Sequence, residues 1–276
     1  MKKDNPSGKI YWHGAFYAVA EAELIDYKHG IQIENEHLLS KEALQVDVLV
    51  IKKESGLQMK KNIGRIFKDR NLIEYKSPAD TLTISDYNKV NGYGFLYSAF
   101  NHVEVDDVTI TFVVLLLTPK LRAYLTDVRG FSLEEIETGI TYVKGDTFTT
   151  QIIEQSKLSK FENLFLSNLT ENIQREDISK ILSAFDEQGT LNIKNRYVQV
   201  IAQLKPRAFR EAISMNSYTT ELEEVLMELV EEKGITATIK ANGMKEVAKK
   251  MLRIGEPLEK ISLITDLDIS VLESLR

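Results

Sequence analysis

Ala43-Leu44-Gln45-Val46-Asp47-Val48-Leu49-Val50-Ile51 and, further along the chain, Asn71-Leu72-Ile73-Glu74-Tyr75-Lys76 are the two stretches that decide the expected fold. Both are rich in apolar and β-branched residues, which is typical of strands buried in a sheet. Each contains a carboxylate inside its apolar run, Asp47 in the first and Glu74 in the second. A carboxylate is costly to bury unless a cation or hydrogen-bond donors lie beside it. These two acids are therefore the first candidates for a functional site.

Lys76 adds a cation to this pair of acids. Side chains alternate along a strand, so Glu74 and Lys76 share one face and Ile73 and Tyr75 share the other. Two carboxylates on neighbouring strands can hold a hard divalent cation such as Mg²⁺ or Mn²⁺ through oxygen ligands. A lysine beside them can stabilise the charge that grows on an attacked phosphate, or help to position a water molecule. The ordinary alternative is a solvated edge strand, but the upstream acid Asp47 favours a metal-dependent phosphodiesterase site.

A helix expected at residues 11–28 precedes these strands, and its apolar residues recur at helical spacing. Glu23 falls within the apolar stripe of this helix, whereas Glu21 falls on the opposite side. We therefore expect Glu23 to be a third site acid that faces the sheet near Asp47. The alternative is that Glu23 pairs with a lysine at the edge of the stripe. The stripe consists of Trp12, Phe16, Val19, Ala20 and Tyr27.

The rest of the chain changes character near residue 157. Before it, strand and helix patterns alternate, which predicts an α/β domain over residues 1–165; after it, helical patterns predict an all-α accessory region over residues 166–276, without catalytic residues of its own. Ser85 is the expected N-cap of a helix in the first region. The further expected strands are 31–37, 43–53, 71–76, 108–117, 139–144 and 149–154. The further expected helices are 58–68, 85–100, a short one from Pro119, 174–186, 205–215, 219–233, 243–254 and two short ones within 258–276.

Basic residues lie between the two site strands and on the helix that follows them. Beside a metal site, such residues are expected to contact the phosphates of a substrate. The alternative is a solvated helix face, which is the usual explanation of such runs. The expected substrate-binding residues are Lys52, Lys53, Lys60, Lys61, Arg65 and Lys89.

Composition excludes several classes of function. The 276 residues carry a formal net charge of −6, so nucleic-acid binding must come from a local patch or from metal ions. The absence of cysteine excludes disulfides, thiolate zinc sites and a cysteine nucleophile. Residues 1–9 lack the apolar core of a signal peptide, and the apolar run 112–117 is too short to span a bilayer. These features favour a cytoplasmic protein without membrane attachment.

The glycine-containing segment at residues 92–94 and the histidines are not expected to belong to a functional site. Gly92-Tyr93-Gly94 falls in a helical run and lacks the third glycine of a dinucleotide-binding loop, so no such cofactor is expected. The four histidines show no helical zinc-binding spacing. They are His13, His29, His37 and His102.

The order of a helix with Glu23, a strand with Asp47, a strand with Glu74-x-Lys76 and then another helix resembles the PD-(D/E)XK nuclease superfamily. Several segments look like the Rpn-like, transposase-associated nucleases of bacteria. The resemblance covers residues 11–160 well and the end of the chain loosely. The segments that carry it are Leu44–Lys53, Ile63–Phe67, Ile73–Pro78, Lys89–Tyr93, Ala248–Leu252 and Ile261–Leu267.

This resemblance implies a fold, a cofactor and an activity. The fold would be a restriction-endonuclease-like core with a central mixed sheet flanked by helices. Asp47 and Glu74 would bind Mg²⁺ or Mn²⁺ and Lys76 would assist hydrolysis of nucleic-acid phosphodiester bonds, with DNA favoured over RNA. The alternative is a catalytically inactive binding or regulatory module that kept the nuclease fold. Cutting both strands of a duplex commonly needs two sites, so a homodimer is expected to supply the second.

Overall fold

The structure of the protein is a computed structural model that describes residues 11–36, 45–54, 56–188, 196–215, 218, 226 and 235–275. The chain divides into two compact units. The first contains the described residues of Met1–Ile173 and Asn195–Val200. The second contains those of Gln174–Lys194 and Ile201–Arg276.

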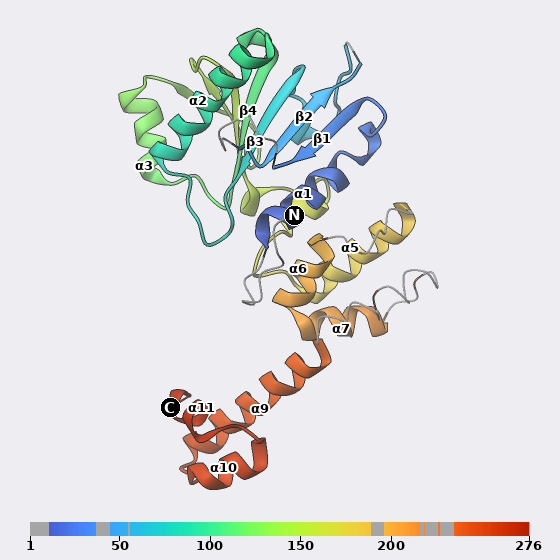
Figure 1. The fold of residues 1–276 in the computed structure, drawn as a ribbon, viewed down its shortest axis with the longest axis vertical. Coiled ribbons are helices and arrows are strands. Elements are labelled where there is room, and N and C mark those ends of the chain that lie inside the picture. The colour runs from blue at the N-terminus through green and yellow to red at the C-terminus, as the bar shows by residue number, and fades with distance from the viewer. Residues whose placement is uncertain are drawn as a thin grey trace. The chain divides into compact units, whose positions relative to one another are not determined.

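The described residues of the first unit form an α/β fold around a seven-stranded mixed sheet in the order β1-β2-β3-β4-β7-β6-β5 (Figure 1). The pairs β1–β2, β2–β3, β7–β6 and β6–β5 are antiparallel, whereas β3–β4 and β4–β7 are parallel. The strands are β1 (Ile31–Asn35), β2 (Val48–Lys52), β3 (Arg70–Tyr75), β4 (Val108–Val114), β5 (Ser132–Glu137), β6 (Ile140–Lys144) and β7 (Thr149–Glu154).

The strands expected from apolar patterns are confirmed within a few residues, and β5 is an addition. Residues 37, 43 and 44 of the expected strand pair lie outside the described residues. β5 has the sequence Ser-Leu-Glu-Glu-Ile-Glu and is the last strand of the sheet. Because an edge strand is largely solvated, charged residues are tolerated there and mask the strand pattern.

Helices cover both faces of the sheet. α1 (Trp12–Glu23) lies on one face and α2 (Ile84–Asn101) on the other (Figure 1). α1 is shorter than expected and is followed by the 3₁₀ turn η1 (Ile25–Tyr27). The remaining elements of this unit are η2 (Asn62–Gly64), η3 (Val105–Asp107), α3 (Pro119–Ala123), the π-helical turn η4 (Tyr124–Val128), η5 (Gln155–Lys157) and α4 (Leu164–Ser167).

Two local expectations are wrong. Residues 58–68 contain one 3₁₀ turn, η2, and otherwise form coil and turns rather than a helix. The Asn62 side chain accepts a hydrogen bond from the N–H of Ile63 at 2.9 Å, and such a local contact competes with helical hydrogen bonding. The N-cap of α2 is Thr83 and not Ser85. Thr83 and Asp86 form a reciprocal capping box, which satisfies two backbone N–H groups where a single serine would satisfy one.

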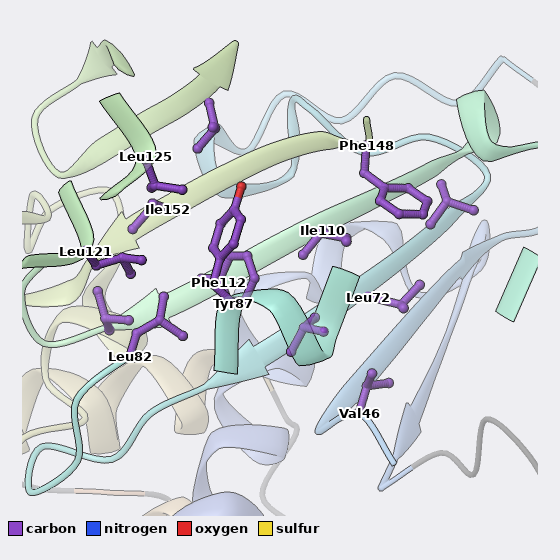
Figure 2. Close-up of a cluster of buried hydrophobic side chains, with 14 of the residues drawn as sticks. Val46, Leu72, Leu82, Tyr87, Ile110, Phe112, Leu121, Leu125, Phe148 and Ile152 are labelled. Atoms are coloured by element: carbon purple, nitrogen blue, oxygen red, sulfur yellow. The ribbon is translucent and has the colours of Figure 1, made fainter. Parts of the chain in front are cut away.

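The core lies on both faces of the central strands. On the α2 face, the ring of Tyr87 stacks on that of Phe112 with 4.9 Å between centroids, among buried residues of β3, β4 and β7 (Figure 2). On the α1 face, Phe16 stacks on Tyr75 with 4.4 Å between centroids. Because residues alternate along β3, Tyr75 faces α1 whereas Leu72 belongs to the α2-side core. The sheet is thus packed between two helices near its centre.

The described residues of the second unit are helical. α5 packs against α7, α7 against α9, and α10 against α9 and α11. The expected helices at 174–186 and 205–215 and the two terminal helices are confirmed, and the helix expected at 243–254 is the longer α9. α6, whose residues belong partly to the first unit and partly to the second, was not expected. The expected helix at 219–233 lies outside the described residues except for Leu226. The bounds are α5 (Arg175–Gln188), α6 (Arg196–Leu204), α7 (Pro206–Met215), α9 (Ile235–Arg253), α10 (Leu258–Thr265) and α11 (Ile269–Ser274).

Among the described residues, no helix is both long enough and apolar enough to cross a bilayer.

The two glycines of α2 give a test of how tightly this helix packs on the sheet. A Cβ atom at Gly94 would lie 2.7 Å from the buried ring of Phe148, whereas a Cβ at Gly92 meets nothing within 4 Å. We expect Gly92→Ala to raise the free energy of unfolding by about 1 kcal/mol through helix propensity. Gly94→Ala should instead lower it by about 1–3 kcal/mol through overpacking. Chemical denaturation measures both, and a stabilised Gly94→Ala variant would contradict the packing described here.

Candidate metal centre

The first candidate acid, Asp47, lies directly before β2 and beside β3. In the antiparallel pair the last registered partners are Val48 and Ile73, so Asp47 and Glu74 are the residues that follow directly at this end of the ladder. The Asp47 carboxylate also accepts a hydrogen bond from the backbone N–H of Tyr75, with 2.8 Å between N and Oδ2. The pairing of the two strands therefore brings the two predicted acids together.

Glu74 and Lys76 lie on the same side of the chain, as strand alternation predicts. The Lys76 Nζ atom lies 3.1 Å from Glu74 Oε1 and 3.2 Å from Asp86 Oδ1. All three side chains are largely buried, with exposed fractions of 8% for Glu74, 16% for Lys76 and 23% for Asp86. The ammonium is thus held between a carboxylate of β3 and one of α2. Asp86 was not foreseen as a site residue, because its position depends on the capping box that begins α2.

The electrostatics of this cluster favour a bound cation. Burial raises the pKa of Glu74 above its ordinary value, and the negative charge of Asp47 raises it further, against the opposing effect of Lys76. Burial alone would lower the pKa of Lys76, but Glu74 and Asp86 together raise it. Two neighbouring carboxylates that repel each other in a partly dry setting are stabilised when a divalent ion lies between them.

His13 is a site residue that the sequence analysis missed. Its Nδ1 atom lies 2.8 Å from Asp47 Oδ1, and its ring meets the Tyr75 ring edge-on with 6.1 Å between centroids. The hydrogen bond to Asp47 raises the pKa of His13, and burial partly opposes this. The available signal was its spacing from Phe16, because residues three apart on a helix share a face, and Phe16 packs on β3.

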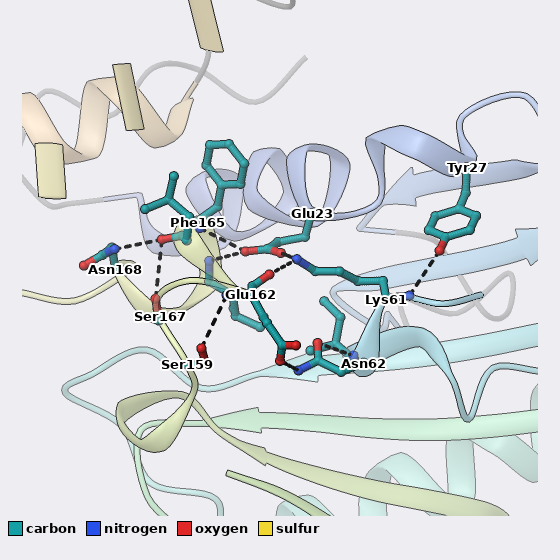
Figure 3. Close-up of polar contacts among 12 residues, drawn as sticks. Glu23, Tyr27, Lys61, Asn62, Ser159, Glu162, Phe165, Ser167 and Asn168 are labelled. Carbon is teal, nitrogen blue, oxygen red and sulfur yellow. Dashed lines mark hydrogen bonds and ion pairs between the residues drawn. The ribbon is translucent and has the colours of Figure 1, made fainter. Parts of the chain in front are cut away.

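Glu23 is not part of this cluster, which corrects the expectation that it faces Asp47. One of its carboxylate oxygens accepts hydrogen bonds from the N–H groups of Phe165 and Leu166, both at 2.9 Å (Figure 3). The other lies 2.6 Å from Lys61 Nζ. Glu23 is the last residue of α1 whereas His13 is the second, and ten residues of α-helix span roughly 15 Å. The alternative, a pairing with a lysine, is what the structure shows.

Of the six predicted phosphate-binding residues, one borders the acids, and the other five form contacts elsewhere or are exposed to solvent. Lys89 borders the acids, with its Nζ 3.8 Å from Asp86 Oδ1, and its charge acts on Glu74. Lys61 pairs with Glu23, and Arg65 pairs with Glu137. Lys52 donates to the carbonyl of Leu57 at 3.0 Å, while Lys53 and Lys60 are exposed. Much of the basic segment therefore stabilises the fold around η2 rather than facing the acids.

The donor set fits a hard divalent cation. Each oxygen of Asp47 accepts one hydrogen bond, and a carboxylate oxygen has about two lone-pair directions, so each retains one for a metal. Glu74 supplies the second carboxylate. In the part of the chain that the structure describes, no group of three or more histidine and acidic side chains has the arrangement of a metal site, so the fit rests on these two carboxylates. Oxygen donors of this kind suit Mg²⁺ or Mn²⁺.

Comparisons with known proteins do not supply a relative. No protein-family model, curated protein or solved structure matches this chain. The interpretation of the site therefore depends on its geometry and on the motifs it contains.

The raised pKa of Glu74 gives a prediction for the metal-free protein. A carboxyl group whose pKa is raised by folding destabilises the folded state once it is ionised, and this penalty disappears below its ordinary pKa of 4.5. Glu74→Gln should therefore raise the free energy of unfolding at pH 8, by on the order of 1 kcal/mol, and have no such effect at pH 4. Denaturation in EDTA across this pH range measures it. Glu134→Gln on the exposed edge strand is the control and should change little at either pH.

Glu23 should be a structural acid rather than a site acid. Its side chain is 1% exposed, so removing it takes the acceptor from two backbone N–H groups and leaves the ammonium of Lys61 with the carbonyl of Glu162 but no carboxylate. We expect Glu23→Ala to lower the free energy of unfolding by about 3 kcal/mol. The exposed Glu21 on the same helix is the control, and Glu21→Ala should cost less than about 0.5 kcal/mol. If Glu23→Ala keeps full stability but loses Mn²⁺ binding, then Glu23 belongs to the site after all.

Proposed function

We propose that this protein is a metal-dependent nuclease that hydrolyses phosphodiester bonds of nucleic acids, with DNA as the favoured substrate. The observation that carries the proposal is the convergence of Asp47, Glu74 and Lys76 where β2 and β3 meet. The succession of α1, a strand after Asp47, a strand with Glu74-x-Lys76, and α2 supports the resemblance to the PD-(D/E)XK superfamily. The parallel pairing of β3 with β4 makes the sheet mixed, as that resemblance implies.

Each residue of the site has a definable role in this reaction. Asp47 and Glu74 would hold Mg²⁺ or Mn²⁺, which when bound supplies a Lewis acid for the phosphate and lowers the pKa of a coordinated water. The pKa of Lys76 is raised above its ordinary value of 10.5, so this side chain is protonated at neutral pH. Lys76 therefore acts as a cation that stabilises charge developing on the phosphate, and not as a general base. Lys89, which is 46% exposed, can contact a neighbouring phosphate.

A second candidate function is a binding or regulatory module without catalytic activity. The observation in its favour is that the acids already have protein partners: His13 and the Tyr75 N–H for Asp47, and Lys76 for Glu74. A module of this kind would bind nucleic acid and leave it intact. The proposed nuclease would instead cut it only when a divalent ion is supplied, and cutting of both strands of a duplex would require a second copy of the chain.

A cleavage assay decides between these functions. The full-length protein is incubated with supercoiled plasmid or with RNA, in Mg²⁺, Mn²⁺ or EDTA. We expect nicking that EDTA abolishes and that Lys76→Ala slows by about 100-fold or more, since the lysine stabilises charge on the transition state. The control is Lys144→Ala on β6, an exposed lysine outside the site.

The outcomes of this assay are distinct. Divalent-dependent cleavage that survives in Lys144→Ala but not in Lys76→Ala supports the nuclease. If the wild-type protein and the two variants bind nucleic acid in a binding assay but none of them cleaves it, the inactive module is supported. Cleavage of equal rate in wild type and Lys76→Ala points to a contaminating enzyme and removes the support for the proposed site.

A further inference from the structure

The carboxylate of Asp47 is fixed by donors from two different elements. Its Oδ2 atom accepts from the N–H of Tyr75 on β3, and its Oδ1 atom contacts Nδ1 of His13 on α1, both at 2.8 Å. A carboxylate with a single donor can turn about its last torsion angle, but a donor on each oxygen fixes its plane. Asp47 is 16% exposed, so water has limited access to compete for these contacts.

The His13 side chain is 44% exposed, and the packing of α1 on β3 places its ring beside Asp47. His13 is the second residue of α1, and Phe16, one turn further along, stacks on Tyr75 with ring planes 5° apart. The imidazole meets the same Tyr75 ring edge-on. Because the partner of Nδ1 is a carboxylate, which only accepts, Nδ1 carries the hydrogen of this bond. The helix and the strand that hold His13 therefore also determine where its N–H points.

We propose that His13 is a positioning residue, whose Nδ1–H orients the Asp47 carboxylate so that its remaining lone pairs face a divalent cation shared with Glu74. This inference rests on the proposed function, because it assigns His13 a role at the same site. Donors that orient a metal-binding carboxylate typically contribute 10–100-fold to metal affinity. His13 reaches the metal only through Asp47 and is not itself a ligand.

A purely structural role would have a different signature. If the contact between His13 and Asp47 only attached α1 to the sheet, its loss would lower stability and leave the metal affinity of the folded protein unchanged. If it orients Asp47, metal affinity falls in a protein that is still folded. Direct metal binding, measured apart from catalysis, therefore separates the two roles.

A pair of amide substitutions isolates the Nδ1 contact. In His13→Asn the amide nitrogen takes the place of Nδ1, whereas in His13→Gln it takes the place of Nε2. Both are similar in size and polarity and lie in the first turn of α1, so the pair differs mainly in the donor offered to Asp47. The exposed His29 provides the control substitution, His29→Gln. Asp47→Asn is the reference variant that removes the ligand charge.

Mn²⁺ binding to the full-length proteins is measured by isothermal titration calorimetry, without nucleic acid. We expect His13→Asn and His29→Gln to bind within about threefold of wild type, and His13→Gln to bind 10–100-fold more weakly. Equal affinity of His13→Gln and wild type, with Asp47→Asn impaired, would overturn the role of His13 and leave the proposed function standing. If His13→Asn and His13→Gln weaken Mn²⁺ binding equally, the Nδ1 contact is not the cause, and the proposed role of His13 is overturned. If wild type binds no Mn²⁺, the proposed function fails and the role of His13 fails with it.

Discussion

The antiparallel register of β2 and β3 is the constraint on which the rest of the site depends. Since side chains alternate along a strand, the pairing of Val48 with Ile73 brings Asp47 and Glu74 to the same end of the two strands. A slip of one residue would carry the Glu74 side chain to the opposite face of the sheet. The flanking helices meet this same end of the sheet, α1 through His13 and α2 through Asp86.

Two buried carboxylates of the same unit differ in how well their charge is compensated by neighbouring groups. Glu23 is surrounded by complementary groups, namely two backbone N–H donors and the ammonium of Lys61. Glu74 is paired with Lys76 but also faces the charge of Asp47, and its pKa is raised as a result of burial and this repulsion. The charge of Glu23 is therefore compensated by its partners in the folded state. The ionised Glu74 carboxylate remains destabilised by burial and by repulsion from Asp47, and a bound cation can relieve this. Such destabilised groups are common at functional sites.

Patterns local in the sequence predicted much of the fold and the centre of the site, and contacts between distant segments account for what they missed. Apolar runs located β2, β3 and β4, and alternation placed Glu74 with Lys76. A helical wheel gave the direction of Glu23 but not its position along the axis, and its partners Phe165 and Leu166 are 142 and 143 residues away. The spacing of His13 from Phe16 indicated the face on which it lies, but the contacts of His13 and Asp86 with the site depend on how the two helices dock on the sheet.

The distribution of charge has a consequence for how such a site would recognise a polyanion. The chain is acidic overall, and Lys61 and Arg65 are neutralised by Glu23 and Glu137. In the part of the chain that the structure describes, Lys76 and Lys89 lie beside the acids, and both are near Asp86. The site by itself therefore offers little net positive charge to a phosphate. In the proposed nuclease a divalent ion would supply that charge, so that metal binding and nucleic-acid binding would strengthen each other by the same factor, as linkage requires.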